Sequence, residues 1–345
     1  MSKIDITQLV RPMVREIAPY RSARDDFEDF EAQKVFLDAN ENPYNSIANR
    51  YPDPLQRQLK RTLAKIKGVE ANQILLGNGS DEVLDLVLRA FCEPGQDEVI
   101  LLPPTYGMYA VLAQLNNVKV NTVPLNESFQ LDLEGIMKQV NGNTKVIFVC
   151  SPNNPTGNSI PLEQIQSLLN QFSGLVVVDE AYVDFSTKGS AVRFLDDYPH
   201  LMICQTFSKA YGLAGIRLGM GIADSKIIDY FNKIKPPYNV NTLSINAALQ
   251  VLSEIKKIEL QINQIKQERE IMSMQLNELD MVIKVYPSDT NFLLVKFKNE
   301  KVVFQKLLNN GVVVRNRASQ IDNCLRITVG TKTENEQLIK LLKEK

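Results

Sequence analysis

The sequence predicts an α/β fold in which helices cover both faces of a mainly parallel sheet, followed by a smaller α+β domain. Short runs rich in Val, Ile and Leu alternate with amphipathic helices from about residue 41 to residue 240. This alternation stops near residue 241, where a long helical stretch precedes a set of shorter elements. A chain of 345 residues is also too long for one small core, which favours two domains.

Five short apolar runs in the first part of the chain are predicted to be strands of the large sheet. Each is rich in Val, Ile and Leu, which is typical of strands buried on both faces. The runs cover residues 98–102, 145–150, 175–180, 201–207 and 218–223. Their alternation with helices predicts mostly parallel pairing, because parallel strands need long crossover connections.

Two helices between these strands have clear sequence signals. Residues 80–92 place five apolar side chains on one helical face: Val83, Leu84, Val87, Leu88 and Phe91. Residues 161–172 begin with Pro161, which suits a first helical position. Residues 1–40 are expected to form an N-terminal arm with a short helix, which joins the small domain.

Residues 241–345 are predicted to form the small C-terminal domain, and residues 41–240 the large domain. The small domain opens with a helical stretch from about residue 244 to residue 279, whose length predicts one break. A strand, a helix, two strands and a final helix are then expected at residues 290–297, 300–311, 312–317, 324–330 and 334–345.

Composition argues against several classes of protein. Lys and Arg number 39 against 40 acidic residues, so no overall positive field would attract nucleic acid or an anionic membrane. The first residues lack the apolar core of a signal peptide, and no apolar run approaches the roughly 18–20 residues that cross a bilayer. Four scattered cysteines favour free thiols in the cytoplasm. A single histidine, His200, argues against a histidine-built metal site and against a Ser-His-Asp triad.

Polar residues follow three of the predicted strands at their carboxyl ends, which is where open α/β sheets bind ligands. The segment SPNNPTG follows the strand at 145–150 and contains Asn154. The segment DEAY contains Asp179 and Tyr182, and TFSK contains Lys209. We expect these side chains to meet at one edge of the sheet.

A glycine-rich turn, GNGSDE, leads into the helix at residues 80–92. A helix N-terminus presents free backbone N–H groups and a positive dipole end, so it suits a phosphate group. Ser80 or Asp81 is the expected N-cap. Pyridoxal 5'-phosphate needs this combination, because its aldehyde condenses with an amine, its pyridine nitrogen pairs with a carboxylate and its phosphate needs a cationic seat. Each feature alone is common elsewhere, whereas their joint occurrence at strand ends is far more specific.

The motifs also resemble those of a known family over nearly the whole chain, from about Pro19 onward. SPNNPTG, DEAY and TFSKAYGLAGIRLG, in this order and spacing, resemble the large-domain motifs of fold-type-I aminotransferases. More narrowly, PYRSAR, PPTYGMY, CSPNNPTG and CLRITVG resemble those of histidinol-phosphate aminotransferases. The resemblance implies a seven-stranded type of sheet in the large domain and pyridoxal 5'-phosphate as cofactor.

This resemblance implies a role for each residue around the cofactor ring. Lys209 corresponds to the lysine that forms the Schiff base and moves the proton, and Asp179 to the carboxylate beside the pyridine nitrogen. Tyr182 and Asn154 would hydrogen-bond the phenolic oxygen of the ring, and Tyr106 would stack on its face.

The cofactor phosphate has its own set of expected ligands. By the resemblance these are Gly79, Ser80, Asp81, Thr206, Ser208 and Arg217. Arginine is well suited to this position because it stays charged and binds phosphate with two parallel N–H groups. Tyr51 resembles a tyrosine that reaches the phosphate across a dimer interface, which implies a homodimer with shared active sites. Without the family, core packing in a proline-rich turn would be the better reading of Tyr51.

The substrate is expected to meet cations from the small domain. In the resemblance Arg326 binds the carboxylate of glutamate or the phosphate of histidinol phosphate, and Arg315 and Tyr20 help to hold the phosphate end. Asn154 and Asn291 are further candidates for this pocket. Arg317 would lie on the same strand face as Arg315 if the strand continues, so either arginine could take the role.

The reaction implied is a ping-pong transamination. Glutamate would convert the pyridoxal form to the pyridoxamine form, and imidazole-acetol phosphate would then take the amino group to give L-histidinol phosphate. Two alternatives on the same fold stay open: an aromatic-amino-acid aminotransferase, which has little use for a second cation at Arg315, and a decarboxylase of the threonine-phosphate type. A regulator that senses pyridoxal phosphate is a further class, but the near-neutral charge gives it no support.

Overall fold

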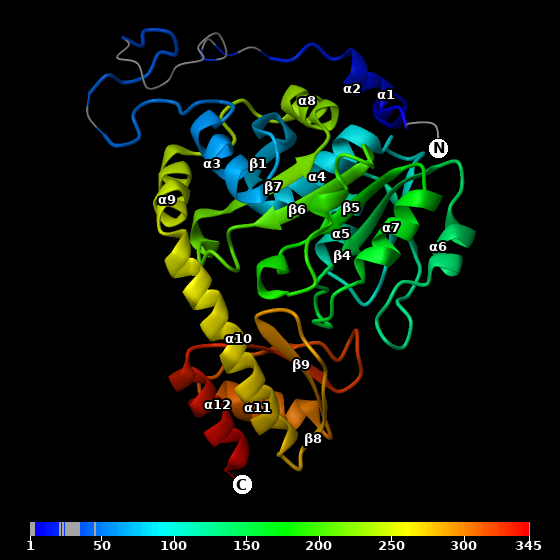
Figure 1. Ribbon diagram of the computed structural model, residues 1–345, viewed down its shortest axis with the longest axis vertical. Helices are drawn as coiled ribbons and strands as arrows, with labels where there is room; N and C mark the ends of the chain where they lie inside the picture. The colour runs from blue at the N-terminus through cyan, green and yellow to red at the C-terminus, as the bar shows by residue number, and fades with distance from the viewer. Residues whose placement is uncertain (1–3, 21, 23, 25–34, 45, 345) are drawn as a thin grey trace.

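The computed structural model describes residues 4–20, 22, 24, 35–44 and 46–344 of the chain. They form a large domain around one sheet and a smaller domain, which the long helix α10 (Ile255–Asn277) connects (Figure 1). None of the described helices is both long and apolar enough to cross a membrane.

The large domain contains a seven-stranded sheet with the order β1-β7-β6-β5-β4-β2-β3. The strands are β1 (Ile74–Asn78), β2 (Glu98–Leu101), β3 (Lys119–Thr122), β4 (Thr144–Cys150), β5 (Leu175–Asp179), β6 (Leu201–Thr206) and β7 (Leu218–Ala223). The five apolar runs of the sequence all form strands here, whereas β1 and the partly exposed edge strand β3 were not predicted.

The pairing is mainly parallel, as expected, with one exception. Strands β2 to β6 pair in parallel with their neighbours, and β7 pairs antiparallel with both β6 and β1. Only residues 207–217 separate β6 from β7, and they contain no α-helix that could return the chain to the start of the sheet. The connection is therefore a turn at the carboxyl end of β6, and this turn carries Lys209.

Helices cover both faces of the sheet, which divides the apolar core into two layers. One layer packs against α3 (Arg57–Lys67), α6 (Leu133–Gln139), α7 (Leu162–Gln171) and α9 (Thr242–Ser253). The other packs against α1 (Ile6–Leu9), α2 (Pro12–Glu16), α4 (Gly79–Phe91), α5 (Met108–Leu115) and α8 (Ser225–Ile234). Pro161 is the N-cap of α7 and not its first helical residue.

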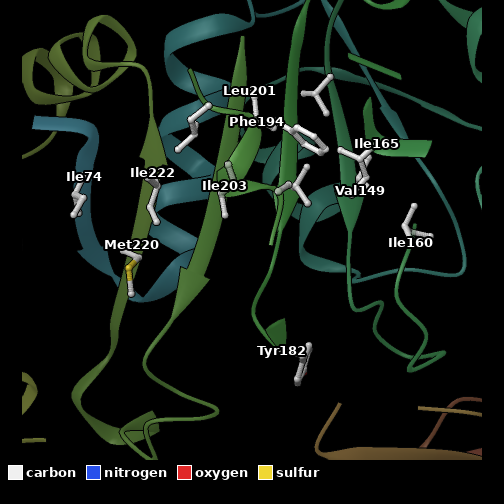
Figure 2. Packing of buried hydrophobic residues seen from close by; sticks show 14 of the residues in the cluster. Ile74, Val149, Ile160, Ile165, Tyr182, Phe194, Leu201, Ile203, Met220 and Ile222 are labelled. Atoms are coloured by element: carbon white, nitrogen blue, oxygen red, sulfur yellow. The ribbon is translucent and has the colours of Figure 1, made fainter. Parts of the chain in front are cut away.

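Figure 2 shows part of the first layer, with Ile74, Ile222 and Ile203 on adjacent strands. Tyr182 lies beyond the strand ends, on the side that faces the small domain. Short 3₁₀ helices complete this part of the chain: η2 (Ala71–Gln73), η3 (Val183–Phe185), η4 (Ala191–Phe194) and η5 (Ala214–Ile216). Of these, η3 follows β5 and η5 lies in the turn between β6 and β7.

The small domain contains a four-stranded antiparallel sheet with the order β10-β11-β9-β8. Its elements are β8 (Val282–Val285), β9 (Phe292–Phe297), α11 (Glu300–Asn309), β10 (Arg315–Asn316), β11 (Cys324–Thr328) and α12 (Lys332–Lys343). The predicted order of elements after residue 290 is present, and β8 is additional. The strand expected at 312–317 is limited to the two residues of β10.

The helical stretch at the domain junction breaks once, as expected, at Glu254 between α9 and α10. Ala248 and Leu252 of α9 belong to the large-domain core, as does Ile258 at the start of α10, whereas Met272 and Leu276 belong to the core of the small domain.

The first helices of the arm do not lie on the small domain as expected. Ile6, Val10 and Val14 are buried in the core layer of α4 and α8, and the backbone N–H of Arg11 donates to the carbonyl of Ala90 (2.9 Å). Their apolar side chains cover the large domain, because they continue the apolar face that α4 and α8 present there.

Candidate active site

A cavity of about 450 Å³ opens where the carboxyl ends of β4, β5 and β6 face the small domain. It is lined by Ser80, Asp81, Tyr106, Cys150, Asn154, Asp179, Ala181, Tyr182, Thr206, Ser208, Lys209, Ala214, Arg217, Arg315, Arg317 and Arg326. Side chains from seven separate segments of the sequence therefore meet in one place, as the strand-end argument predicts.

Lys209 lies in the turn between β6 and β7. The turn is closed by backbone hydrogen bonds from Gly212 to the Lys209 carbonyl (3.2 Å) and from Leu213 to the Phe207 carbonyl (3.0 Å). The amine Nζ lies 5.7 Å from the ring centroid of Tyr182. Burial, followed by the nearby charge of Arg326, lowers the pKa of Lys209 below its ordinary value. The amine is thus more available as a free base than that of a surface lysine.

Asp179 ends β5 inside the cavity and is almost completely buried. Its Oδ2 accepts a hydrogen bond from the hydroxyl of Tyr109 (2.7 Å), and its Oδ1 accepts one from the backbone N–H of Ala181 (3.1 Å). Burial raises the pKa of Asp179, while these two donors oppose the rise. Within the described residues Asp179 has no ion pair. A cation bound in the cavity could therefore pair with this carboxylate.

Tyr109 is a contributor that the sequence analysis missed. It is fully buried, stacks on Phe148 (ring centroids 5.0 Å apart) and contacts the edge of Tyr106 (5.5 Å). A signal was present in PPTYGMY, because Tyr109 follows Tyr106 by only three residues, although Tyr106 precedes α5 and Tyr109 lies in its first turn.

The N-terminus of α4 forms a second wall of the cavity. Neither Ser80 nor Asp81 is its N-cap: the cap position is Asn78, which makes no side-chain capping bond because its amide donates to the carbonyl of Asn239 (2.6 Å). The amino end of the helix dipole is thus left uncapped by any side chain, next to Arg217. Gly79 has a φ of 75°, and a Cβ built there would approach Nη2 of Arg217 to 2.8 Å.

Arg217 faces this helix end from the start of β7, and its own backbone is left-handed with a φ of 53°. Its Nη2 lies 3.6 Å from Oδ2 of Asp81, and its side chain is 52% exposed. The hydroxyl of Thr206 accepts a hydrogen bond from the backbone N–H of Ser208 (3.1 Å). All the residues expected at the cofactor phosphate, apart from Tyr51, therefore lie around this one corner of the cavity.

Asn154, Tyr106 and Tyr182 complete the part of the site that the large domain supplies. Oδ1 of Asn154 accepts a hydrogen bond from Nη1 of Arg326 (2.6 Å), which joins the two domains across the cavity. The hydroxyl of Tyr106 donates to Oδ1 of Asp81 (3.1 Å). Burial raises the pKa of both tyrosines, so both hydroxyls stay protonated as hydrogen-bond donors.

The small domain supplies three arginines from β10, β11 and the residue that follows β10. Arg315 and Arg326 are directly opposite each other in the antiparallel pair, so both side chains point to the same face. Arg315 is exposed and Arg326 half-buried over the ring of Phe292 (5.3 Å). Arg317 also lines the cavity. With Lys209 and Arg217 the lining has five cationic groups against Asp81 and Asp179, so the cavity favours anionic ligands.

Four predicted site residues do not line this cavity, and one of them, Gly79, lies next to Arg217 at the N-terminus of α4. Tyr20 is 75% exposed on the arm. Tyr51 stacks on Tyr238 (ring centroids 4.3 Å apart) and lines a separate cavity together with Arg50 and Arg57. The carbonyl of Asn291 accepts a hydrogen bond from Val329 (2.9 Å), and its side chain is not among those that line the cavity. One chain alone does not bring these side chains to Lys209.

Comparisons with known proteins agree with this geometry. The family described as aminotransferase class I and II matches residues 25–342. A histidinol-phosphate aminotransferase from Christiangramia forsetii is 54% identical over 346 residues, which cover 100% of this chain and 99% of the relative. Another from Flavobacterium psychrophilum is 51% identical, with 99% of each chain covered. The crystal structure of the histidinol-phosphate aminotransferase from Clostridium acetobutylicum has a TM-score of 0.79 at 25% identity and covers 86% of this chain and 90% of that one.

The match extends over both domains, and the motifs that line the cavity lie inside it. The chain therefore belongs to the class I and II aminotransferases and, within them, to the histidinol-phosphate aminotransferases.

Proposed function

We propose that this chain transfers an amino group between L-histidinol phosphate and 2-oxoglutarate, with pyridoxal 5'-phosphate as cofactor and Lys209 as the reacting amine. One observation carries the proposal: a single cavity brings together Lys209, the buried carboxylate of Asp179, which has no ion pair among the described residues, and three arginines from the small domain.

The residues fit the cofactor at each of its polar ends. Asp179 would hold the pyridine nitrogen, because a buried carboxylate gains a cationic partner there. The uncapped N-terminus of α4, with Arg217, Thr206 and Ser208, would hold the phosphate. When bound, pyridoxal 5'-phosphate supplies an electron sink for negative charge on the substrate's α-carbon.

Lys209 performs the proton chemistry in this proposal. Its lowered pKa increases the fraction of unprotonated amine, which is the form that acts as a nucleophile. The same Nζ then takes the proton from the α-carbon of the substrate and delivers it during the transfer. The turn between β6 and β7 holds the amine beside Tyr182 while its flexible stem lets it move.

The other large-domain residues orient and hold the ring. Tyr109 keeps the carboxylate of Asp179 in place and favours its ionised form. Tyr182 and Asn154 offer hydrogen bonds at the opposite side of the ring, and Tyr106 packs at its face.

The arginines of the small domain bind the anionic ends of the substrate. Arg326 is aligned by Asn154 and is the candidate for the carboxylate of glutamate. A second anionic group, such as the substrate phosphate, would meet the remaining arginines, since charge-assisted hydrogen bonds contribute about 1.5–3 kcal/mol each. An aromatic amino acid would leave those cations without a partner, which favours a phosphate-bearing substrate.

We further propose a cytoplasmic homodimer in which Tyr51 reaches the cofactor phosphate of the partner subunit. Large apolar side chains are exposed along the segment that precedes it, including Leu37 (89%), Tyr44 (82%) and Ile47 (84%), and a second copy of the chain would cover them. The four buried, free cysteines support a reducing compartment. We also propose that residues 41–240 form the large domain and residues 241–345 the small domain.

One half-reaction tests the function. The yellow holoenzyme is mixed with L-histidinol phosphate and, separately, with phenylalanine, and absorbance follows conversion to the amine form of the cofactor. We expect conversion at a much lower concentration of L-histidinol phosphate. Preference for phenylalanine would favour the aromatic aminotransferase, and release of carbon dioxide from phenylalanine without a keto product would favour the decarboxylase. Lys209→Ala should abolish turnover and leave the circular dichroism spectrum unchanged.

A further inference from the structure

Arg317 has a buried polar group that no other described residue satisfies. Its backbone N–H donates to the carbonyl of Cys324 (2.9 Å), which fixes the residue at the end of β10. Its Nε is buried and, among the described residues, has no hydrogen-bond partner. Buried N–H groups in native proteins almost always have a partner. Because the same side chain lines the cavity, the missing partner points to a ligand.

The surroundings of Arg317 are strongly positive. Burial lowers the pKa of this guanidinium most, and the charges of Arg326 and Arg315 lower it further. The two acidic residues in the lining, Asp81 and Asp179, both come from the large domain. Three guanidinium groups on one wall therefore repel one another until an anion enters, and a dianion relieves this repulsion more than a carboxylate does.

The three arginines differ in how far they are already engaged. Arg326 is bonded to Asn154 and lies over Phe292. Arg315 is exposed to solvent, where its charge is screened. Arg317 is half-buried, and Nε2 of Gln320 in the segment after it donates to the carbonyl of Thr105 in the large domain (3.4 Å). Arg317 thus combines depth, a fixed backbone and an N–H group that has no partner among the described residues.

We propose that Arg317 binds the phosphate of the substrate directly and that it, more than Arg315, sets the preference for a phosphate-bearing amine over its phosphate-free analogue. Its Nε–H and a neighbouring Nη–H form the edge that binds two phosphate oxygens. Arg315 attracts the anion from the rim of the cavity. This inference rests on the proposed function and names the residue that recognises the phosphate of the substrate.

Discrimination between L-histidinol phosphate and L-histidinol tests the inference on the holoenzyme. The quantity measured is the ratio of kcat/KM for the two amines, together with the inhibition constant of inorganic phosphate. Arg317→Gln should lower the ratio roughly ten- to a hundredfold, mainly through KM, and weaken phosphate inhibition. Arg315→Gln removes the same charge, and we expect the factor by which it lowers the ratio to be several times smaller than that for Arg317→Gln. Arg317→Lys keeps the positive charge but lacks the forked guanidinium group, so its ratio of kcat/KM values should lie between those of the wild type and Arg317→Gln.

Arg193→Gln, an exposed arginine of the large domain, serves as the control and should leave the ratio unchanged. The inference is overturned if Arg317→Gln keeps the wild-type ratio, or if Arg315→Gln lowers it more. If the wild-type enzyme itself shows no preference for the phosphate-bearing amine, the proposed function fails before the variants are compared. The two failures are therefore distinguishable.

Discussion

At the scale of single residues, the site depends on the ionisable groups of Asp179 and Lys209, which the fold desolvates to different extents. Asp179 and Lys209 shift in opposite directions, because burial penalises the charged form of each: it raises the pKa of the acid and lowers that of the amine. Both shifts bring these groups closer to neutrality. A bound cofactor with a cationic nitrogen and a reactive carbonyl carbon would meet both needs.

Tyr109→Phe should weaken binding of pyridoxal 5'-phosphate about tenfold, because a hydrogen bond to a buried charged group is lost. Without this donor the pKa of Asp179 rises further, so the loss of affinity should be greatest at the acidic end of the range. Fluorescence titration of the apoenzyme with pyridoxal 5'-phosphate at several pH values measures this loss of affinity. Tyr198→Phe removes the hydroxyl that bonds Asn170 far from the cavity, and should have no effect. Unchanged affinity of Tyr109→Phe at every pH would contradict the role given to this tyrosine.

Arg326→Gln should move the pH dependence of cofactor capture by the apoenzyme to higher pH. The positive charge of Arg326 lowers the pKa of Lys209, so its removal raises that pKa and reduces the free amine at a given pH. Stopped-flow absorbance gives the capture rate as a function of pH. Arg326→Lys keeps the charge and should stay near the wild-type profile, while a shift to lower pH in Arg326→Gln would show the electrostatic argument to be wrong.

At the scale of elements, the phosphate corner is shaped by close contact between α4 and β7. A Cβ at Gly219 would lie 2.2 Å from the backbone nitrogen of Ser80 and 2.4 Å from the carbonyl carbon of Gly79. Only a glycine lets the strand lie this close to the first turn of the helix. The helix end and Arg217 can therefore face the same ligand.

Gly219→Ala should lower the free energy of unfolding by about 1–3 kcal/mol, because rigid backbone atoms must move to accommodate the methyl group. It should also weaken cofactor binding, since those atoms belong to the proposed phosphate seat. Urea denaturation and cofactor titration measure the two effects. Gly142→Ala, where a Cβ would have no neighbour within 4 Å, is the matched control. A fully stable Gly219→Ala variant with normal cofactor affinity would show that the contact is not tight.

At the scale of the whole molecule, the two domains meet at the cavity through a few polar contacts. Arg326 reaches Asn154 there, and the backbone N–H of Asp289 donates to the carbonyl of Gly157 (2.7 Å). The carboxylate of Asp289 in turn accepts from the backbone of Ser159 (3.2 Å). The small domain is thus fixed above the strand ends at the position where its arginines can meet a substrate.

Mixed dimers test the proposed role of Tyr51 across a subunit interface. Each of Lys209→Ala and Tyr51→Phe should be impaired alone, the first completely. In a heterodimer of the two, one site carries both lesions if Tyr51 acts on the partner, and the other site is intact. Co-expressed and doubly tagged heterodimers should then show about half the wild-type activity per dimer. Activity no greater than that of Tyr51→Phe subunits alone would mean that Tyr51 acts within its own chain.

The sequence by itself determined the apolar strands, the helices with clear periodicity and the polar residues that end β4, β5 and β6. These features are local, since burial on both faces requires a continuous apolar run and a strand end is marked by the first polar residues after it. Even here, β3 was missed because an edge strand is only partly buried and lacks that signal.

Only the tertiary structure decided which distant groups touch. Tyr109 and Asp179 are 70 residues apart in the chain, and Asn154 and Arg326 are 172 apart. Such pairs are set by the order of strands in the sheet and by the placement of the second domain, neither of which is encoded in the periodicity of any one segment. The same holds for Arg317, whose Nε lacks a partner among the residues that the structure describes, a property seen only once β10, β11 and the strand ends of the large domain are assembled around it.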